Sequence, residues 1–546
     1  MGTIEESLAA LAANISQPST AEMNSAVGRW QTFSGCFVAK EFEESSKVRR
    51  HMAAFKAGAL TDDAKQWSAI DWQEAWRQVR RLQMRIAKAV QEGRRGKVKA
   101  LQRILTRSFY AKVLAVKRVT SNKGKKTPGV DGILWRGARA QMQAARSLTQ
   151  HGYFAQLLRR IYIAKKNGKK RPLSIPTMYD RAMQALYKLA LAPVAETTAD
   201  LNSYGFREGR RCADAIAAAF NALSKPISAT WILEGDITGC FDNISTSWLL
   251  DNIPLEKAIL RQWLTAGYVE NGVTYPSYKG TPQGGIISPA LSNMTLDGLE
   301  QAVHAAVPRR VRVNFILYAD DFIITGKSKR LLEEVVKPVV EQFLKERGLT
   351  LSAEKTHITH IKNGFTFLGQ TFRKYGNKLL ITPSVEGVQS LISKVGTMIR
   401  KHVSAPMEVL IGKLNRVLRG WANYHRHVVA SEAFSRVDNY VFHQLWRMLR
   451  RRHNNKSKGW LINHYWKATG KKWIFSVIKK VKRVKRLYQV IRVSSIGIRR
   501  HIKIIAAANP YLPEYAFYFH KRRNNRESRL MLALTARAHR AMFSAS

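Results

Sequence analysis

The sequence predicts an α+β fold for the centre of the chain, followed by a helical unit and a strongly basic C-terminal region. Short strand-like and helix-like patterns alternate between residues 161 and 372, with hairpins among them, which is typical of the α+β class. After residue 383, apolar residues recur almost entirely at helical spacing. The 546 residues exceed one hydrophobic core, so about three or four domains are expected.

The charge balance indicates a polyanionic partner. Lys and Arg total 91 against 38 Asp and Glu, a formal net charge of +53, while 45% hydrophobic residues provide for packed cores. Nucleic acid neutralises such an excess without sequence readout, because phosphate contacts release counterions. A basic protein of the membrane surface is the alternative, but the charge is spread through folded-looking segments rather than gathered in one tail.

The sequence predicts neither a membrane span nor a secreted, disulfide-bonded protein. No apolar run reaches about 18 residues, and the N-terminus carries Glu5 and Glu6 without a basic-then-apolar signal pattern. The three cysteines, Cys36, Cys212 and Cys240, lie far apart, which disfavours a disulfide framework or a cysteine zinc site. A reducing cytoplasm is the expected compartment.

The N-terminal part is predicted to pass from a weakly patterned, flexible or adapter-like extension over residues 1–65 to two helices. The first helix has a basic outer face and the apolar stripe Trp72, Trp76, Val79, Leu82, Ile86 and Val90. The second helix is predicted over Lys97–Phe109, and Asn122–Gly132 is expected to be a loop rich in Gly, Lys and Pro.

The segment from 161 to 372 carries the predicted sheets. Its strand candidates are Arg160–Ala164, Thr230–Ile237, Asn314–Tyr318, Phe322–Thr325 and Thr366–Phe372. Its helix candidates include Asp180–Leu191, Ala213–Leu223 and Leu331–Arg347. Beyond it, three apolar stripes predict a three-helix unit: Val385–Val403, then Leu410, Leu414, Val417 and Trp421, then Phe434, Val437, Val441, Leu445 and Met448.

The C-terminal region interleaves basic clusters with aromatic residues. The clusters are Arg450–Arg452, Lys479–Lys485 and Lys521–Arg523, and the aromatic residues are Trp460, Tyr465, Trp466, Trp473 and Tyr488. Aromatic rings beside cations suit nucleic acid, through stacking and phosphate contacts. Ordinary burial tendencies would place about 70% of such rings in a core instead.

Two segments carry the candidate catalytic acids. In Asn314–Thr325, two apolar runs flank Ala319–Asp320–Asp321, which predicts a hairpin with adjacent carboxylates near its tip. In Trp231–Ile244, an apolar strand ends at Asp236. An isolated Asp-Asp pair is most often a solvated turn. Three carboxylates at neighbouring strand ends, however, could hold two cations about 3.5–4 Å apart, which supports nucleotidyl transfer.

These acids lie in a motif, Tyr318-Ala-Asp-Asp321, that resembles the signature of reverse transcriptases. Five further blocks resemble segments of that family in the family's order: Lys165–Leu173 with Ile175–Thr177, Tyr204–Arg207, Gly280–Pro289 with Asn293, Gly348–Thr356, and Phe365–Gly369. Six ordered blocks make a chance resemblance negligible.

The resemblance is closer to the bacterial reverse transcriptases encoded by group II introns. Thr127–Gly132 is typical of that group, and Arg419–His425 resembles the maturase-type thumb called domain X. Ala508–Glu514 with Tyr518–Phe519 resembles the close of the group's DNA-binding region. The resemblance covers roughly residues 69–523. It implies a right-hand polymerase with an antiparallel palm sheet, an α-helical thumb and a basic DNA-binding region.

The implied domain boundaries follow from these blocks. They are an N-terminal extension at 1–65, reverse transcriptase fingers and palm at 66–375, thumb or domain X at 376–452, a DNA-binding region at 453–523 and a C-terminal tail at 524–546.

For catalysis, the resemblance assigns roles to the three acids. Asp236 and Asp320 resemble the two bridging metal ligands, and Asp321 resembles the supporting carboxylate. Carboxylates together with substrate phosphates suit magnesium, so two Mg²⁺ ions are implied at the polymerase site.

For nucleotide binding, the resemblance implies four residues. Lys165 and Arg171 would hold the triphosphate, and Gln283 would contact the incoming nucleotide. Phe241 resembles a steric gate whose ring crowds a 2′-hydroxyl and so favours deoxynucleotides. Without the family context, Phe241 would be a core residue and the two cations solvated charges.

The implied function is an RNA-directed DNA polymerase that also binds its own intron RNA to assist splicing. Its implied partners are group II intron RNA, target DNA with a primer for target-primed reverse transcription, and deoxynucleoside triphosphates. The implied location is a bacterial cytoplasm, in nucleoid-associated ribonucleoprotein. Many relatives carry a C-terminal HNH endonuclease with paired cysteines. The chain after Tyr518 has no cysteine, so that nuclease is expected to be absent and an existing nick or fork to supply the primer.

Three other functions stay open at this point. A splicing factor with an inactive polymerase fold is disfavoured by the complete set of acids. A reverse transcriptase repurposed for defence or repair shares the polymerase blocks, although the maturase-like thumb favours the intron role. An RNA-dependent RNA polymerase shares the palm chemistry, but Phe241 and the set of blocks disfavour it.

Overall fold

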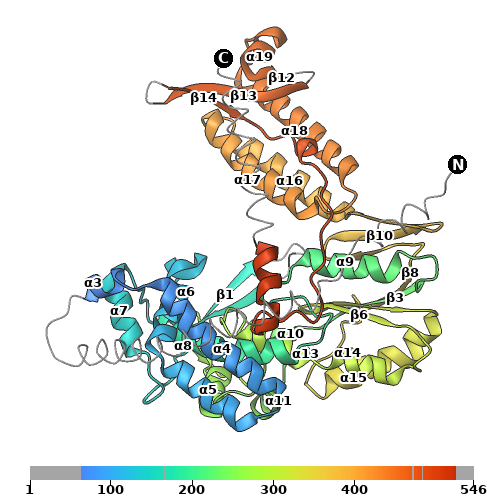
Figure 1. The fold of residues 1–546 in the computed structure, drawn as a ribbon. Coiled ribbons are helices and arrows are strands. Elements are labelled where there is room, and N and C mark those ends of the chain that lie inside the picture. Colours follow the sequence, from blue (N-terminus) through green and yellow to red (C-terminus); the bar gives the residue numbers. More distant parts are fainter. Residues whose placement is uncertain (1–62, 165–167, 169, 470–471, 482–483, 524–546) are drawn as a thin grey trace, which may run out of the picture. The chain divides into compact units, whose positions relative to one another are not determined.

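The computed structural model describes residues 63–164, 168, 170–469, 472–481 and 484–523 (Figure 1). The chain divides into two units, residues 1–69 and 70–546. The described part of the first is helix α3 (Asp63–Ser68), so most of the predicted N-terminal extension lies outside the described residues. All other elements belong to the second unit. None of its described helices is both long enough and apolar enough to span a bilayer.

A group of helices opens the second unit. It comprises α4 (Trp72–Gln91), α5 (Arg95–Arg107), α6 (Phe109–Ser121), α7 (Gly137–Ser147) and α8 (Met178–Thr198). The first three pack against α8, and α7 packs against α6. The helix predicted over 97–109 ends earlier than expected, because Ser108 adopts an extended backbone conformation between α5 and α6.

The apolar stripe predicted for α4 is partly wrong. Val79 is buried as expected, but Trp76 is 52% exposed and Gln83 takes a buried position. The Gln83 amide donates to the carbonyl oxygen of Leu189 in α8 at 2.8 Å. The Gln83 side chain fits between the closely packed helices α4 and α8 because its amide is hydrogen-bonded, whereas the bulky Trp76 indole lies outside this contact.

A four-stranded sheet in the order β2-β1-β4-β5 follows the first helices in the chain. Its strands are β1 (Leu158–Ala164), β2 (Lys170–Ile175), β4 (Tyr268–Glu270) and β5 (Val273–Tyr275). The antiparallel β1–β2 pair confirms the strand predicted at residues 160–164. β1 also runs parallel to β4, so this sheet joins segments that lie far apart in the chain.

A second four-stranded sheet, β6-β7-β3-β8, carries the candidate acids. Its strands are β3 (Trp231–Asp236), β6 (Asn314–Tyr318), β7 (Asp321–Gly326) and β8 (His357–His360). All neighbouring strands are antiparallel, which confirms both the antiparallel sheet and the hairpin predicted around the two adjacent acids.

Helices connect and cover these strands. They are α9 (Cys212–Leu223), α10 (Cys240–Asn243), α11 (Thr246–Asn252), α12 (Lys257–Thr265), α13 (Ser288–Leu296), α14 (Leu299–Ala306) and α15 (Lys337–Lys345). The helix predicted over 331–347 begins as a π-helical segment, Leu331–Val336. Pro338 follows this wide turn, and because proline lacks an N–H, it cannot complete an α-helical hydrogen bond there.

The single strand predicted at residues 366–372 is wrong. The structure has two strands there, β9 (Phe365–Phe367) and β10 (Gln370–Tyr375), which form a three-stranded antiparallel sheet with β11 (Lys378–Pro383). Leu368 and Gly369 reverse the chain with φ of 50° and 70°, which glycine adopts without steric cost. The reversal stacks the Phe365 ring on that of Phe372 at 4.9 Å.

The three predicted thumb helices are confirmed. They are α16 (Val385–Lys401), α17 (Met407–His425) and α18 (Ser431–Arg452). Their predicted stripes face a common core, in which Leu410, Leu414, Phe434, Val437 and Leu445 are buried. This core continues into β9, β10 and β11 through Phe365, Phe372 and Ile381.

Acid is expected to destabilise the thumb through His425. Burial, aided by the nearby His427, lowers the pKa of His425 to about 4, whereas an unfolded histidine titrates near about 6.5. The unfolded state therefore binds the proton more readily, so this contribution to stability is lost as pH falls from about 6.5 towards 4. The loss amounts to about 2 kcal/mol at pH 5. Urea unfolding at pH 7 and pH 5 measures it.

The matched comparison for that experiment is His425→Gln against His304→Gln. The first replacement removes the titrating group and should reduce the pH dependence by about 2 kcal/mol. The second changes a histidine whose side chain is 47% exposed on α14 and should leave the dependence as in the wild type. An unchanged pH dependence in His425→Gln contradicts the assignment.

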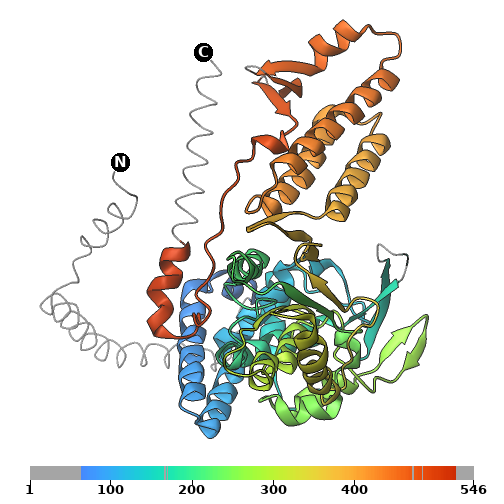
Figure 2. The same cartoon turned by 90° about the vertical axis from the view of Figure 1, so that its right-hand side faces the viewer.

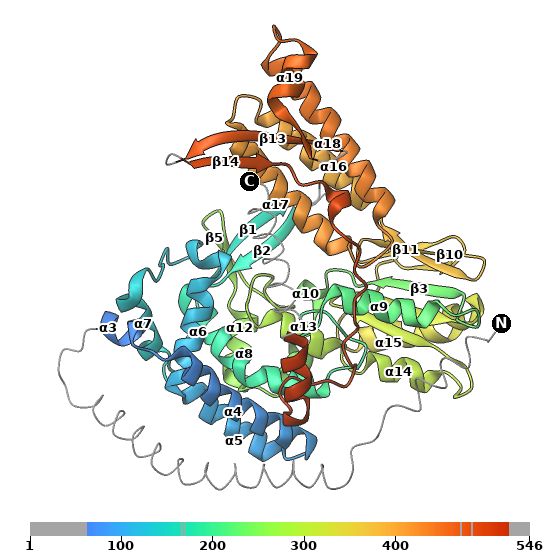
Figure 3. The same ribbon diagram turned by 45° about the horizontal axis from the view of Figure 1, so that its top comes forward.

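The sequence pattern suggested that the chain after the thumb is almost entirely helical. The structure shows that it also contains a sheet. α19 (Lys458–Tyr465) is followed by an antiparallel sheet of β12 (Trp466–Thr469), β13 (Lys472–Val481) and β14 (Val484–Gln489). β13 and β14 lie next to α17 (Figure 3). The aromatic and β-branched residues of Trp473–Ile478 favour a strand, and the neighbouring lysines obscure that signal in the sequence.

The last described part of the chain, residues 499–523, returns to the first helices of the unit (Figure 2). We call it the return segment. The fully buried Asp214 in α9 accepts hydrogen bonds from its His501 Nε2 at 2.8 Å, Ile504 N at 2.7 Å and Arg522 Nη2 at 3.0 Å. The Arg80 guanidinium in α4 lies 4.4 Å above the ring centre of Tyr511. The return segment is therefore part of the polymerase fold.

Candidate active site

Strand register brings the three predicted acids to one end of the β6-β7-β3-β8 sheet. Asp236, the last residue of β3, pairs directly with Asp321, the first residue of β7. Asp320 stands between β6 and β7, in a turn that Ala319 makes with φ of 60°. The three carboxylates thus come from two adjacent strand ends and one tight turn.

Gly205 supports this turn from the neighbouring segment. The amide of Tyr204 donates to the carbonyl oxygen of Leu317 in β6 at 2.8 Å, which draws this segment against the hairpin. A Cβ atom on Gly205 would lie 2.2 Å from the backbone nitrogen of Ala319. Only a glycine allows such close backbone contact, so Gly205 fixes where Asp320 stands.

Gly235 has a similar role within the strand that ends at Asp236. It pairs with Phe322 across the ladder, and a Cβ atom there would lie 2.1 Å from the phenyl ring of that residue. The preceding Glu234 accepts a hydrogen bond from Thr359 Oγ1 in β8 at 2.9 Å. Both residues depart from the apolar pattern expected before a strand-end acid, and these two contacts explain the departure.

Burial and neighbouring charge raise the pKa of two of these carboxylates. Burial, followed by the charges of Asp320 and Asp236, raises the pKa of Asp321 to about 7. Burial likewise raises the pKa of Asp320, with Asp236 adding to the effect. Lys355 Nζ lies 2.7 Å from Asp236 Oδ2, and this hydrogen bond raises the pKa of the lysine. The block at 348–356 was recognised in the sequence, but the contact of Lys355 with an acid was not anticipated.

The donor set suits a hard cation. Within the described residues, no three His, Cys, Asp or Glu side chains already form a metal site. The three carboxylates nevertheless offer oxygen ligands, and the charge of Asp236 raises the pKa of both Asp320 and Asp321. A divalent ion relieves such repulsion, because carboxylate oxygens are its preferred protein ligands.

The predicted nucleotide contacts lie in a hydrogen-bonded chain beside the acids. Arg171 in β2 donates Nε–H to Gln283 Oε1 at 2.8 Å, and Gln283 Nε2 donates to Asp242 Oδ2 at 3.0 Å. Asp242 follows the predicted gate residue Phe241 and was not identified from the sequence. Lys165 lies outside the described residues. This series of hydrogen bonds links the β1–β2 hairpin to the segment that follows Asp236.

Phe241 lies in α10 directly after the β3 acid and is 9% exposed. Its ring meets Phe206 edge to face, with centroids 6.3 Å apart. Its carbonyl oxygen accepts from the amide of Thr281 at 2.6 Å, which holds the Gly280–Pro289 block against it. The sequence did not identify Phe206 as a partner of the gate, although its block was recognised.

Three family descriptions match successive parts of the chain. "Reverse transcriptase (RNA-dependent DNA polymerase)" matches residues 163–372, a span that includes all three acids. "N-terminal domain of reverse transcriptase" matches residues 67–148. "Group II intron, maturase-specific domain" matches residues 388–466, which hold most of the three thumb helices.

Relatives of known sequence agree with these matches. Protein YkfC of Escherichia coli (strain K12) is 29% identical over 364 residues, which are 58% of this chain and 92% of that protein. The group II intron-encoded protein LtrA of Lactococcus lactis subsp. cremoris is 31% identical over 331 residues, 48% of this chain and 54% of that protein. The match thus spans nearly all of the first relative and about half of the second.

Among solved structures, the telomerase of Candida albicans with a fragment of telomeric RNA covers 59% of this chain and 66% of that chain. Its 10% identity and TM-score of 0.34 are too low to support a conclusion. Sequence matches and strand-end acids carry the assignment instead. Residues 163–372 therefore belong to the reverse transcriptase family and residues 388–466 to the maturase-specific domain of group II introns, and the enzymatic class is RNA-directed DNA polymerase, a class that uses divalent metal ions.

Proposed function

We propose that this chain copies RNA into DNA with Asp236, Asp320 and Asp321 as its metal-binding acids, and that it also assists the splicing of its own group II intron. The observation that carries the proposal is the register that pairs Asp236 with Asp321 beside the Asp320 turn. Such a cluster of oxygen donors suits two Mg²⁺ ions, which would activate a primer 3′-hydroxyl and neutralise the leaving pyrophosphate.

The side chains prepare this chemistry by holding and positioning charge. Asp236 and Asp320 are the proposed bridging ligands, and Asp321 is the supporting one. Lys355 binds Asp236 at 2.7 Å, so it has to release a carboxylate oxygen when a cation binds. It would then stand within reach of the triphosphate as a further positive charge.

The nucleotide would lie between the β1–β2 hairpin and the Gly280–Pro289 block. Arg171 and Lys165 are the proposed triphosphate contacts, and Gln283 is the proposed contact of the incoming nucleotide. The hydrogen bond from Arg171 to Gln283 supports this arrangement, because it holds the guanidinium on the side of the hairpin that faces Asp242. Both ends of the nucleotide would thus be positioned by residues linked to each other.

Replacement of Phe241 by alanine is expected to relax discrimination against ribonucleotides. The aromatic ring is the proposed barrier to a 2′-hydroxyl, and its removal should raise the ratio of ribonucleotide to deoxynucleotide incorporation by about tenfold or more. Single-nucleotide primer extension measures this ratio. Phe220→Ala, at a 43% exposed phenylalanine of α9, is the matched control and should keep the wild-type ratio. An unchanged ratio in Phe241→Ala contradicts the gate.

The remainder of the chain would bind nucleic acid through its charge. The proposed division is fingers and palm at 66–375, thumb or domain X at 376–452 and a DNA-binding region at 453–523, between an extension at 1–65 and a tail at 524–546. The net charge of +53 supports contacts to phosphates of structured intron RNA and of target DNA. A primer at the target site would then start reverse transcription.

Two assays on one preparation test the proposal. Primer extension on an RNA template with Mg²⁺ and deoxynucleotides should yield full-length DNA. Addition of protein to an unspliced transcript of the flanking intron should lower the magnesium concentration that splicing requires. Splicing without DNA synthesis would identify a splicing factor that lacks polymerase activity. DNA synthesis without an effect on splicing would identify a reverse transcriptase repurposed for defence or repair.

A further inference from the structure

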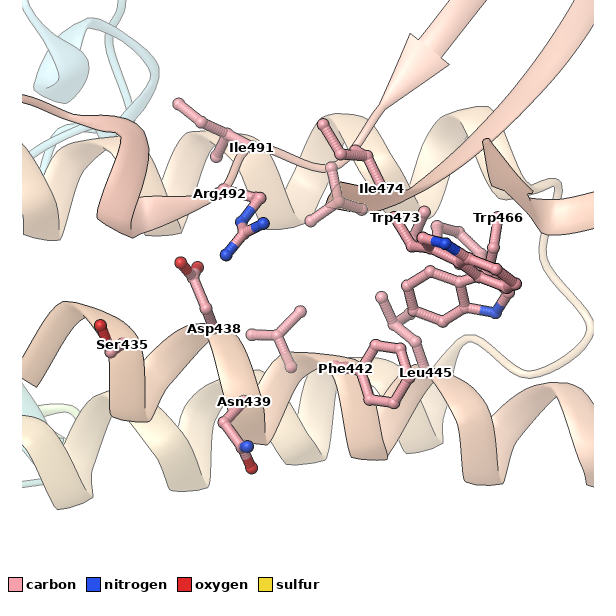
Figure 4. Close-up of a pocket in the computed structure, with 13 residues that line it drawn as sticks. Ser435, Asp438, Asn439, Phe442, Leu445, Trp466, Trp473, Ile474, Ile491 and Arg492 are labelled. Atoms are coloured by element: carbon pink, nitrogen blue, oxygen red, sulfur yellow. The ribbon is translucent and has the colours of Figure 1, made fainter. Parts of the chain in front are cut away.

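A cavity of about 320 Å³ separates α18 from the β12-β13-β14 sheet and the strand end that follows it (Figure 4). It lies in the thumb and in the proposed DNA-binding region, away from the three acids. One end is aromatic, with Phe442, Trp466 and Trp473, and the other is polar, with Asp438 and Arg492. Its volume is at the lower limit of about 300–1,000 Å³ for small-ligand pockets.

The aromatic end offers ring faces rather than a closed core. Phe442 is 39% exposed and Trp473 is 51% exposed. Trp466 is buried, with its ring centroid 4.5 Å from that of Phe442 and 5.3 Å from that of Phe475, which it meets edge to face. A planar ring system that entered here would cover aromatic surface which now contacts solvent.

The polar end offers a free donor beside a fixed acceptor. Asp438 is held in place by the amides of Val493 and Ser494, at 2.6 and 2.9 Å. In the part of the chain that the structure describes, the Arg492 guanidinium makes no hydrogen bond and no ion pair. Figure 4 shows its planar fork pointing into the cavity from the side opposite Asp438. Such a fork can bind the polar edge of a base.

The surroundings favour an anionic polymer over an apolar peptide. Lys480, Lys485 and Arg486 lie exposed on the β13–β14 hairpin, and Arg450 and Arg451 lie at the end of α18. Phosphates on either side of a bound base would meet this charge. A hydrophobic side chain from a protein partner would gain nothing from it.

We propose that this cavity receives one unpaired nucleobase of a single-stranded nucleic acid, stacked on Phe442 and Trp473 and bound at its edge by Arg492. The inference rests on the nucleic-acid-binding role proposed for residues 453–523 and adds to it a site that recognises a base. Stacking supplies affinity with little sequence preference, and the Arg492–Asp438 end supplies the preference.

Photocrosslinking of the full-length protein to short oligouridylate with 5-iodouridine tests the proposal. Mass spectrometry should locate crosslinks on peptides that contain Phe442 or Trp473. An oligothymidylate with 5-iododeoxyuridine, run in parallel, tells RNA from DNA as the strand that enters. An abasic oligomer of equal length and charge should compete about tenfold less well for these crosslinks, because it cannot stack.

Variants separate the cavity from general phosphate binding. Phe442→Ala should reduce the cavity crosslinks about tenfold, and Arg492→Gln should alter their dependence on the base. Lys485→Ala should weaken binding of the normal and abasic oligomers equally and lower the salt dependence by about one charge. Phe154→Ala, at a 73% exposed ring elsewhere, is the matched aromatic control.

Two outcomes have distinct meanings. The base site is overturned if the oligomer binds but crosslinks only to other peptides. It is also overturned if the abasic oligomer competes for the cavity crosslinks as well as the normal oligomer does. Both outcomes leave the proposed nucleic-acid role intact. Failure of the wild-type protein to bind any oligomer contradicts that role itself.

Discussion

The Asp320→Ala variant is expected to lose primer extension on an RNA template by at least about a thousandfold, with RNA affinity retained. The carboxylate stands in the Ala319 turn beside the paired Asp236 and Asp321, so its removal takes away a proposed bridging ligand. No other carboxylate of the cluster can replace it, since the other two are fixed at strand ends. Single-turnover extension with Mg²⁺ measures the loss, and filter binding measures the affinity.

The matched control for that variant is Asp251→Asn. Asp251 carries the same acidic group, but its side chain is 72% exposed at the end of α11. The primer-extension rate of Asp251→Asn should equal that of the wild type. Substantial DNA synthesis by Asp320→Ala would remove this acid from the proposed metal site, and parallel losses in both variants would point to general damage of the fold.

Gly205→Ala should reduce primer extension by about a hundredfold while the protein stays folded. The added Cβ would lie 2.2 Å from the Ala319 backbone nitrogen, and neither backbone can yield cheaply, so the turn that carries Asp320 must shift. A displacement of about 1 Å in a catalytic group is enough for a loss of this size. Extension rates report the loss, and circular dichroism with urea unfolding reports whether the fold persists.

Gly96→Ala is the control for the added methyl group. Gly96 lies in α5 with nothing within 4 Å of the position of its Cβ, so alanine there should leave activity unchanged. It should also stabilise α5 slightly, because alanine has the higher helix propensity. Wild-type activity in Gly205→Ala would mean that the hairpin tolerates movement and that Gly205 does not fix the turn.

The acid cluster could be predicted from the sequence because its determinants are local. Apolar runs that end in Asp236 and flank Asp320 already specify strands and a turn, and the family blocks supply the order of the segments. The thumb helices were predictable for the same reason, since their apolar residues repeat at helical spacing over several turns.

The parts that escaped prediction depend on contacts between distant residues or on weak local signals. The pairing of Lys355 with Asp236 joins residues 119 positions apart, and the Phe206–Phe241 contact needs the fold to exist. The division of the predicted strand into β9 and β10 depends on only two residues, Leu368 and Gly369, whose positive φ angles reverse the chain. The sheet after α19 was missed because lysines interrupt its β-branched and aromatic residues.

The return segment has a consequence for how the protein is made. Asp214 is synthesised long before His501, Ile504 and Arg522, which provide three of its hydrogen bonds. Until the ribosome has delivered them, this buried carboxylate lacks its partners, and an unpaired buried charge is costly. Helix α9 of a nascent chain therefore lacks these partners until the return segment has left the ribosome. Active polymerase should consequently form only once the return segment has been translated, well after the three acids themselves.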